Sequence, residues 1–119
     1  MNNRELGRIG EEAAVRHILS QGMKLLARNY RFGRMGEIDI IAQDGDTLCF
    51  IEVKARRGDR YGTPAEAVLP GKRKTIIKVA QAYTARYGIH DMPLRFDVVE
   101  IYMAADGKIR SVEHIRGAF

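Results

Sequence analysis

The sequence has few of the residues that build disulfide frameworks and zinc sites. It contains one cysteine, Cys49, which excludes an internal disulfide and any metal site that needs several cysteines. Cys49 lies in an apolar run, a setting typical of a small core residue rather than of a nucleophile. None of the histidines has the spacing of a histidine metal motif, so we expect structural or solvated roles for His17, His90 and His114.

Long apolar runs are also absent. No stretch approaches the roughly 18 consecutive apolar residues that a membrane span requires. The first residues, Met1 to Glu5, lack the apolar core of a signal peptide. We therefore expect a cytoplasmic protein without a membrane partner.

The composition is typical of one globular domain. Hydrophobic residues make up 45% of the 119 residues and charged residues 29%, which suits a single domain over residues 1–119. No repeat, low-complexity tract or linker divides the chain. The formal net charge of +5 is compatible with a nucleic-acid partner but does not require one.

Positive charge is concentrated between Lys54 and Lys78, where only Asp59 and Glu66 oppose it. Most charge runs are solvated surfaces, but the position of this one directly after Lys54 favours contact with phosphates. Two of its lysines open an expected helix, where the helix dipole disfavours cations, which suggests that they serve a ligand. The candidate nucleic-acid contacts are Arg56, Arg57, Arg60, Lys72 and Lys74.

Hydrophobic periodicity and turn residues predict the order helix, three strands, helix, two strands. A three-strand meander followed by a helical crossover implies an α/β fold with a mixed sheet, and apolar density favours the second and third strands as its centre. The residues after the third strand contain several glycines and prolines and predict a mobile basic loop. The predicted helices are 4–22 and 71–87, the strands are 24–31, 37–43, 47–55, 95–102 and 108–115, and the loop is 56–70.

Two of these strands place charge inside apolar runs. Asp39 follows Gly36-Glu37-Ile38, and Glu52 and Lys54 lie within Phe50-Ile51-Glu52-Val53-Lys54. Because side chains alternate along a strand, Glu52 and Lys54 project from one face. If the two strands pair, Asp39 joins them and forms a carboxylate pair with an adjacent ammonium. Mg²⁺ and similar hard cations prefer such oxygen ligands, and a bound cation beside a phosphate supports phosphodiester hydrolysis.

The strings quoted above resemble a known signature. Asp39 followed by Glu52-Val53-Lys54 resembles the D…(D/E)-x-K signature of the PD-(D/E)XK nuclease superfamily, whose α-β-β-β-α-β core is similar to the predicted order. Within it, the chain resembles the YraN-like family of uncharacterised bacterial proteins. The matching strings run from Gly7 to Val99 and are Gly7-Arg8-Ile9-Gly10-Glu11, Gly36-Glu37-Ile38-Asp39, Ile51-Glu52-Val53-Lys54, Gly62-Thr63-Pro64 with Glu66-Ala67-Val68, and Arg95-Phe96-Asp97-Val98-Val99.

The family pattern is also similar to archaeal-type Holliday junction resolvases, in which an acid on the first helix joins the metal site. Glu11 matches that acid, so the resemblance implies a site of Glu11, Asp39, Glu52 and Lys54 with Mg²⁺ or Mn²⁺ held by the three acids. The sequence departs from the superfamily name in having Ile38 rather than proline before Asp39, which leaves the carboxylate in place.

Other interpretations remain open at this stage. A buried ion pair between Glu52 and Lys54 is a purely structural alternative. Glu37 is as compatible with a supporting contact as with a solvated position. Arg95 and Asp97 share a strand face, which is compatible with a simple ion pair between them.

These residues predict a metal-dependent endonuclease that hydrolyses DNA phosphodiester bonds, with branched or structured DNA among its candidate substrates. The alternative is a nucleic-acid-binding module that keeps the nuclease fold without cleaving and acts with a DNA-processing partner. A weaker third interpretation is an adaptor whose basic surface binds an acidic protein. A homodimer is compatible with symmetric cleavage of two strands. The residues leave open the choice of DNA or RNA and any sequence specificity.

Overall fold

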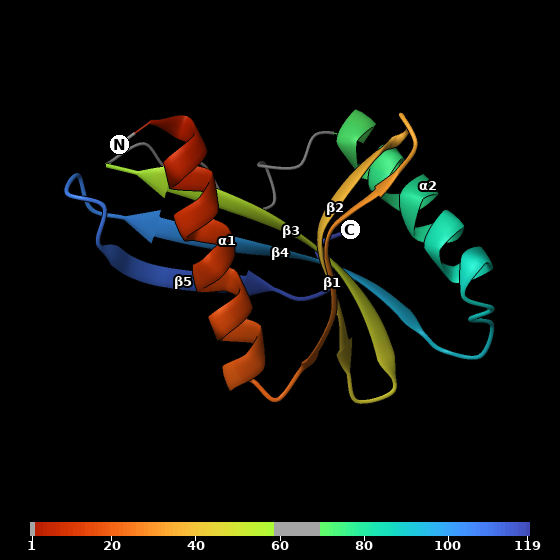
Figure 1. The fold of residues 1–119 in the computed structure, drawn as a ribbon. Helices are drawn as coiled ribbons and strands as arrows, with labels where there is room; N and C mark the ends of the chain where they lie inside the picture. The colour runs from red at the N-terminus through yellow and green to blue at the C-terminus, as the bar shows by residue number, and fades with distance from the viewer. Residues whose placement is uncertain (1, 59–69) are drawn as a thin grey trace.

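The computed structural model describes residues 2–58 and 70–119. Within these ranges the elements follow the predicted order of helix, three strands, helix and two strands (Figure 1). This order confirms the α/β prediction. The elements are α1 (Asn3–Ser20), β1 (Lys24–Phe32), β2 (Gly36–Asp44), β3 (Thr47–Arg57), α2 (Pro70–Arg86), β4 (Leu94–Met103) and β5 (Ile109–Ile115).

The strands form a mixed sheet in the order β1-β2-β3-β4-β5. The β3–β4 pair is parallel and the other pairs are antiparallel, as a meander followed by a helical crossover requires. The centre of the sheet is β3, with β2 and β4 on either side. The sequence placed β2 and β3 at the centre and did not place β4 beside them.

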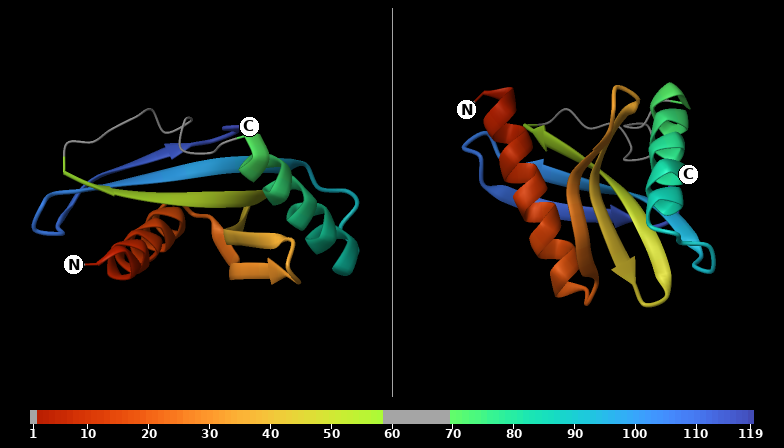
Figure 2. Two further views of the ribbon diagram at one scale, coloured as in Figure 1. Left: turned by 90° about the horizontal axis from the view of Figure 1, so that it is seen from above. Right: turned by 45° about the vertical axis from the view of Figure 1, so that its right-hand side comes forward.

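The two helices pack on opposite faces of this sheet. On β3, Cys49 and Ile51 pack in a cluster with α1, whereas Leu48 and Phe50 pack in a cluster with α2. This alternation is the two-residue period expected of a central strand buried on both faces. Figures 1 and 2 show α1 and α2 lying at the two ends of the strongly twisted sheet. Cys49 is completely buried, which confirms its expected core position.

A close approach between α1 and β3 explains one of the glycines in the first helix. A Cβ atom at Gly10 would lie 2.6 Å from the Cβ of Ala55, a separation that real side chains do not reach. Glycine therefore lets the helix backbone approach the strand that carries the candidate site. Neither helix in the described ranges is long and apolar enough to cross a membrane.

The element boundaries lie within two residues of the predicted ones, and the difference at the end of the third strand bears on the candidate site. Arg56 and Arg57 were expected in a loop, but β3 continues through both of them. Backbone pairing with β4 carries the strand further, since Arg56 is opposite Tyr102 and Arg57 is opposite Met103. Of the rest of the expected loop, Gly58 lies in a bend and Pro70 already belongs to α2. Residues 59–69, including Arg60, lie outside the described residues.

Candidate metal and nucleic-acid site

The candidate site lies where β2 and β3 separate. These strands pair only from Ile40 opposite Ile51 to Asp44 opposite Thr47. Before Ile40, β2 pairs with β1 alone, and beyond Ile51, β3 pairs with β4 alone. Figure 1 shows the β1–β2 hairpin leaving the rest of the sheet and running beside α2. We call this separation the fork.

Asp39 bridges the two sides of the fork. Its Oδ2 atom accepts a hydrogen bond of 2.8 Å from the backbone N–H of Val53. The regular alternation of side chains between the two faces of β2 is interrupted at Asp39. Ile38 and Ile40 would share a face in a regular strand, but Ile38 packs in the hydrophobic cluster with α2 and Ile40 in the cluster with α1. The twist at Asp39 thus lets its carboxylate accept the hydrogen bond from the β3 backbone that a carbonyl of a neighbouring strand would otherwise accept.

Glu52 lies on the β3 side of the same fork. Its side chain is 4% exposed, and its Oε2 atom is 3.3 Å from Nζ of Lys72 in the first turn of α2. That contact lacks hydrogen-bond geometry, and within the described residues Oε2 has no hydrogen-bond partner. A buried carboxylate oxygen without a hydrogen bond is costly unless a cation or donor reaches it.

The two acids influence each other directly. Burial, a hydrogen bond with Glu52 and the charge of Glu52 raise the pKa of Asp39 to about 8. The Val53 N–H and the ammonium of Lys72 oppose this shift without cancelling it. Two carboxylates this close resist simultaneous ionisation, and a divalent cation between them would remove that repulsion.

This raised pKa makes stability depend on pH in a defined direction. An unfolded aspartate has a pKa of about 3.9, so between about pH 4 and pH 8 the folded chain retains a proton that the unfolded chain releases. Without metal, stability should therefore fall as the pH rises through this range. Melting temperatures in EDTA across this range should show a smaller decline for Asp39→Asn than for wild type. Equal declines in the two proteins would contradict the raised pKa.

A small cavity opens on the α1 side of the fork. It has a volume of about 180 Å³, and both Glu11 and Asp39 line it. Glu11 Oε1 accepts hydrogen bonds from Arg28 Nη2 at 3.1 Å and from the Asn29 amide at 2.9 Å. The remaining lining residues are Gly7, Asn29, Glu37, Val53 and Ala55.

Asn29 has an unusual backbone. Its φ of 50° makes it the non-glycine residue with positive φ in the described part of the chain. It lies opposite Asp39 in the β1–β2 register, between the pairs Arg28–Ile40 and Tyr30–Ile38. Asparagine tolerates this conformation better than most residues. The bend directs its amide to Glu11 and so ties the first helix to the fork.

The fork fits a hard divalent cation through Asp39 and Glu52. The carboxylate oxygens are suitable donors, and Mg²⁺ commonly uses one or two carboxylates and keeps several waters. Glu52 Oε2 is a buried acceptor without a hydrogen bond in the described part of the chain. Within residues 2–58 and 70–119, no group of three or more acidic, histidine or cysteine side chains is close enough to form a complete protein cage. Glu11, held by Arg28 and Asn29, remains a predicted third ligand.

The predicted basic residues occupy different positions around the fork. Lys72 contacts Glu52, as described above, while Lys74 on α2 and Arg57 at the end of β3 are exposed. Lys54 is opposite Glu100 on β4. Burial raises the pKa of Glu100, and the charges of Arg56 and Lys54 oppose this shift only in part. Arg56 forms an ion pair with the same Glu100.

Sequence reasoning missed Glu100. It is completely buried between Val99 and Ile101, yet it contacts a predicted phosphate ligand, Arg56. The signal that singled out Glu52, a charge inside an apolar strand, is present here too and would have identified it. No sequence pattern pointed to Arg28 and Asn29. Their contacts with Glu11 depend on the backbone bend at Asn29 and on the packing of α1 beside β1.

The fold and the site together define an α/β protein with a mixed five-stranded sheet and paired acids where two strands separate. The chain belongs to the uncharacterised protein family UPF0102, whose sequence pattern matches residues 10–101. This match confirms the YraN-like resemblance. Because the family is uncharacterised, it brings no activity with it.

Relatives in several bacteria are similar over nearly their whole length. The chain is 50% identical over 108 residues to a UPF0102 protein of Symbiobacterium thermophilum, covering 91% of each chain. It is 44% identical over 119 residues to one of Clostridioides difficile, covering 100% of both chains. A relative in Frankia casuarinae is 46% identical over 114 residues, covering 96% of this chain and 95% of the other.

Proposed function

We propose that this protein is a metal-dependent endonuclease that hydrolyses DNA phosphodiester bonds, with branched or structured DNA as its preferred substrate. The observation that carries the proposal is the pair of neighbouring carboxylates at the fork. Asp39 has a raised pKa because it is buried beside Glu52, and Glu52 keeps a buried oxygen without a hydrogen bond in the described residues. A purely structural pair of this kind would cost stability.

In this proposal, Asp39 and Glu52 hold Mg²⁺ or Mn²⁺, with Glu11 as a further ligand. When bound, the metal polarises the scissile phosphate and lowers the pKa of a coordinated water. Lys54, two residues after Glu52 on the same strand face, orients the attacking water or neutralises phosphate charge. Lys72 keeps a positive charge 3.3 Å from Glu52, which supports a contact with a substrate phosphate at the same position.

The basic residues around the fork support a polyanionic substrate. The chain carries a net charge of +5, and Arg57 at the end of β3 and Lys74 on α2 are exposed cations on the two elements that carry Glu52 and Lys72. Such contacts position a nucleic acid without reading its sequence. A cytoplasmic location and cleavage of two strands by a homodimer belong to the same proposal.

A second function is a nucleic-acid-binding module that does not cleave. The Arg28 and Asn29 contacts to Glu11 favour it, because they occupy an acid that the resemblance assigns to the metal. The paired acids favour the enzyme, because a pure binder gains nothing from carboxylates that face a polyanion.

The test is cleavage of labelled duplex, single-stranded, flap and four-way-junction DNA with Mg²⁺ or Mn²⁺. We expect metal-dependent products, strongest on a branched substrate, that disappear in Lys54→Ala. Binding measured in EDTA should persist in that variant and weaken steeply with salt. Binding without cleavage by wild type would favour the module. The absence of both binding and cleavage would contradict both nucleic-acid functions.

A further inference from the structure

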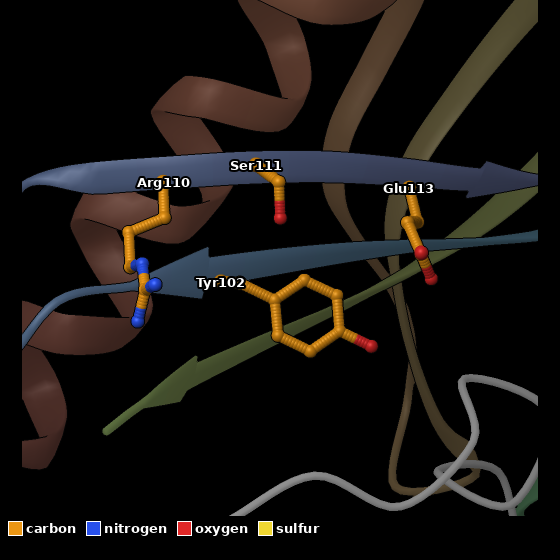
Figure 3. Close-up of a pocket in the computed structure, with 4 residues that line it drawn as sticks. All are labelled: Tyr102, Arg110, Ser111 and Glu113. Atoms are coloured by element: carbon orange, nitrogen blue, oxygen red, sulfur yellow. The ribbon is translucent and has the colours of Figure 1, made fainter. Parts of the chain in front are cut away.

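A second, larger pocket lies away from the fork, on β4 and β5. Its volume is about 470 Å³, and it is lined by Tyr102, Arg110, Ser111 and Glu113. Figure 3 shows these four side chains projecting to the same side of the two strands. It is the face opposite α1, because Ile101, Met103 and Val112 pack in the α1 cluster. The pocket therefore belongs to the sheet face from which Glu52 and Lys54 project.

A β-bulge builds this pocket. Tyr102 pairs with Ser111, but the next residue, Met103, pairs with Ile109, so Arg110 is an extra residue in β5. In a regular strand, Arg110 and Ser111 would project to opposite faces. The bulge turns both toward Tyr102, and bulges often re-aim a side chain in this way beside functional sites.

The four side chains offer complementary contacts for a nucleotide. The ring of Tyr102 presents a flat apolar surface on which a base stacks, and Arg110 is a planar cation that binds phosphate. Ser111 and Glu113 supply hydrogen-bonding oxygens for a base edge. Glu113 would repel a phosphate placed directly on it, which directs the phosphate toward Arg110. Burial, then the charges of Glu100 and Glu113, raise the pKa of Tyr102, so the phenol stays neutral.

The strand register connects this pocket to the fork. Glu52 is opposite Val98, Lys54 is opposite Glu100, and Arg56 is opposite Tyr102. At about 3.3 Å per residue, the four steps along β3 from Glu52 to Arg56 span about 13 Å. This distance is about four steps of a stacked nucleic-acid strand at 3.4 Å each. The buried carboxylate of Glu100 holds Arg56 between the two sites.

We propose that the pocket of Tyr102, Arg110, Ser111 and Glu113 binds one unpaired nucleotide of the substrate strand, with its base on Tyr102 and its phosphate on Arg110. This inference rests on the proposed function for the identity of the strand. It deepens that function, because a pocket for an unstacked base about four steps from the acids favours DNA with unpaired nucleotides over a regular duplex.

The test measures binding of a fluorescent single-stranded oligonucleotide in EDTA. We expect Tyr102→Ala to weaken binding about tenfold, within the range for loss of one base–aromatic stack, and Tyr102→Phe to bind like wild type. Tyr87→Ala, at a 55% exposed tyrosine just beyond the C-terminal end of α2, is the matched control and should have no effect. Arg110→Gln should reduce the salt dependence of the binding affinity by the equivalent of about one phosphate contact. Arg4→Gln removes the same charge on α1, away from the pocket, and serves as its control.

An oligonucleotide with abasic positions separates base stacking from a structural effect. Tyr102→Ala should bind this abasic strand as well as wild type does, while Arg110→Gln should still weaken it. If Tyr102→Ala matches Tyr87→Ala on the normal strand, the pocket inference is wrong and the proposed function stands. If wild type binds no single-stranded oligonucleotide but cleaves a branched substrate, the pocket inference is wrong and the proposed function stands. If wild type neither binds nor cleaves any DNA of the panel, both fail. If the pocket binds free mononucleotides through Tyr102 but does not bind the oligonucleotide, the proposal that it holds a nucleotide of a strand is wrong.

Discussion

Asp39→Asn is expected to abolish metal-dependent cleavage of DNA, with a loss of at least about a thousandfold. A metal supplies several kcal/mol of transition-state stabilisation, and each 1.36 kcal/mol is tenfold in rate. Asparagine keeps the shape of the side chain and can still accept the hydrogen bond from Val53 N–H. It removes the negative charge that would hold the cation beside Glu52 in the proposed site. Initial rates on the preferred substrate of the panel measure this loss.

The same substitution should leave the metal-free protein no less stable at pH 8 and above. The aspartate that it replaces is buried beside another carboxylate, so the amide relieves repulsion there. The matched control is Asp46→Asn, the same chemical change at an exposed position in the β2–β3 turn. It should leave cleavage unchanged. Full cleavage by Asp39→Asn would remove this residue from the catalytic site, and equal losses in both variants would point to a general charge effect.

The largest expected effect on stability comes from Asp97→Ala, which should lower the free energy of unfolding by about 3–5 kcal/mol. Asp97 is completely buried, and its carboxylate contacts Arg95 Nε at 2.9 Å, His114 Nε2 at 2.8 Å and the backbone N–H of Gly117 at 3.0 Å. Alanine would leave three buried or half-buried groups without this acceptor. Urea denaturation, with the slope checked for constancy, measures the change.

Asp44→Ala is the control for this prediction, because Asp44 also pairs with Arg95, at 3.0 Å, but its side chain is 27% exposed. We expect a change of about 1 kcal/mol or less there. Burial opposes ionisation of Asp97, but hydrogen bonds from His114 and Arg95 outweigh it and lower its pKa. Its stabilising contribution is therefore present above about pH 4 and is lost as the pH falls further. A similar cost for both variants would show that burial of Asp97 has no special effect.

The sequence predicted the elements well because their signals are local. Apolar periodicity located both helices, and the Asp44-Gly45-Asp46 turn located the β2–β3 hairpin that brings Asp39 and Glu52 to one place. The predicted pairing of Arg95 with Asp97 is confirmed for the same reason, since alternate residues of a strand share a face.

The features that the sequence did not predict depend on long-range geometry. The fork arises because β2 pairs with β3 only from Ile40 onwards, and no residue pattern specifies where two strands start or stop pairing. The contact between His17 and His114, with ring nitrogens 3.3 Å apart, joins α1 to β5. The bulge at Arg110 exists only in the register between β4 and β5. Each requires the tertiary arrangement before it can be recognised.

The connectivity around β3 also has a consequence for folding. Asp39 and Glu52 belong to one antiparallel hairpin, which closes through local contacts, whereas β4 joins β3 only after the crossover through α2. Non-local parallel pairing is the slower kind of event. We therefore expect the two acids to meet while the β4 side of β3 is still open to water. Their dehydration is then expected to coincide with the docking of α2 and β4, the step that would also bring Lys72 to Glu52.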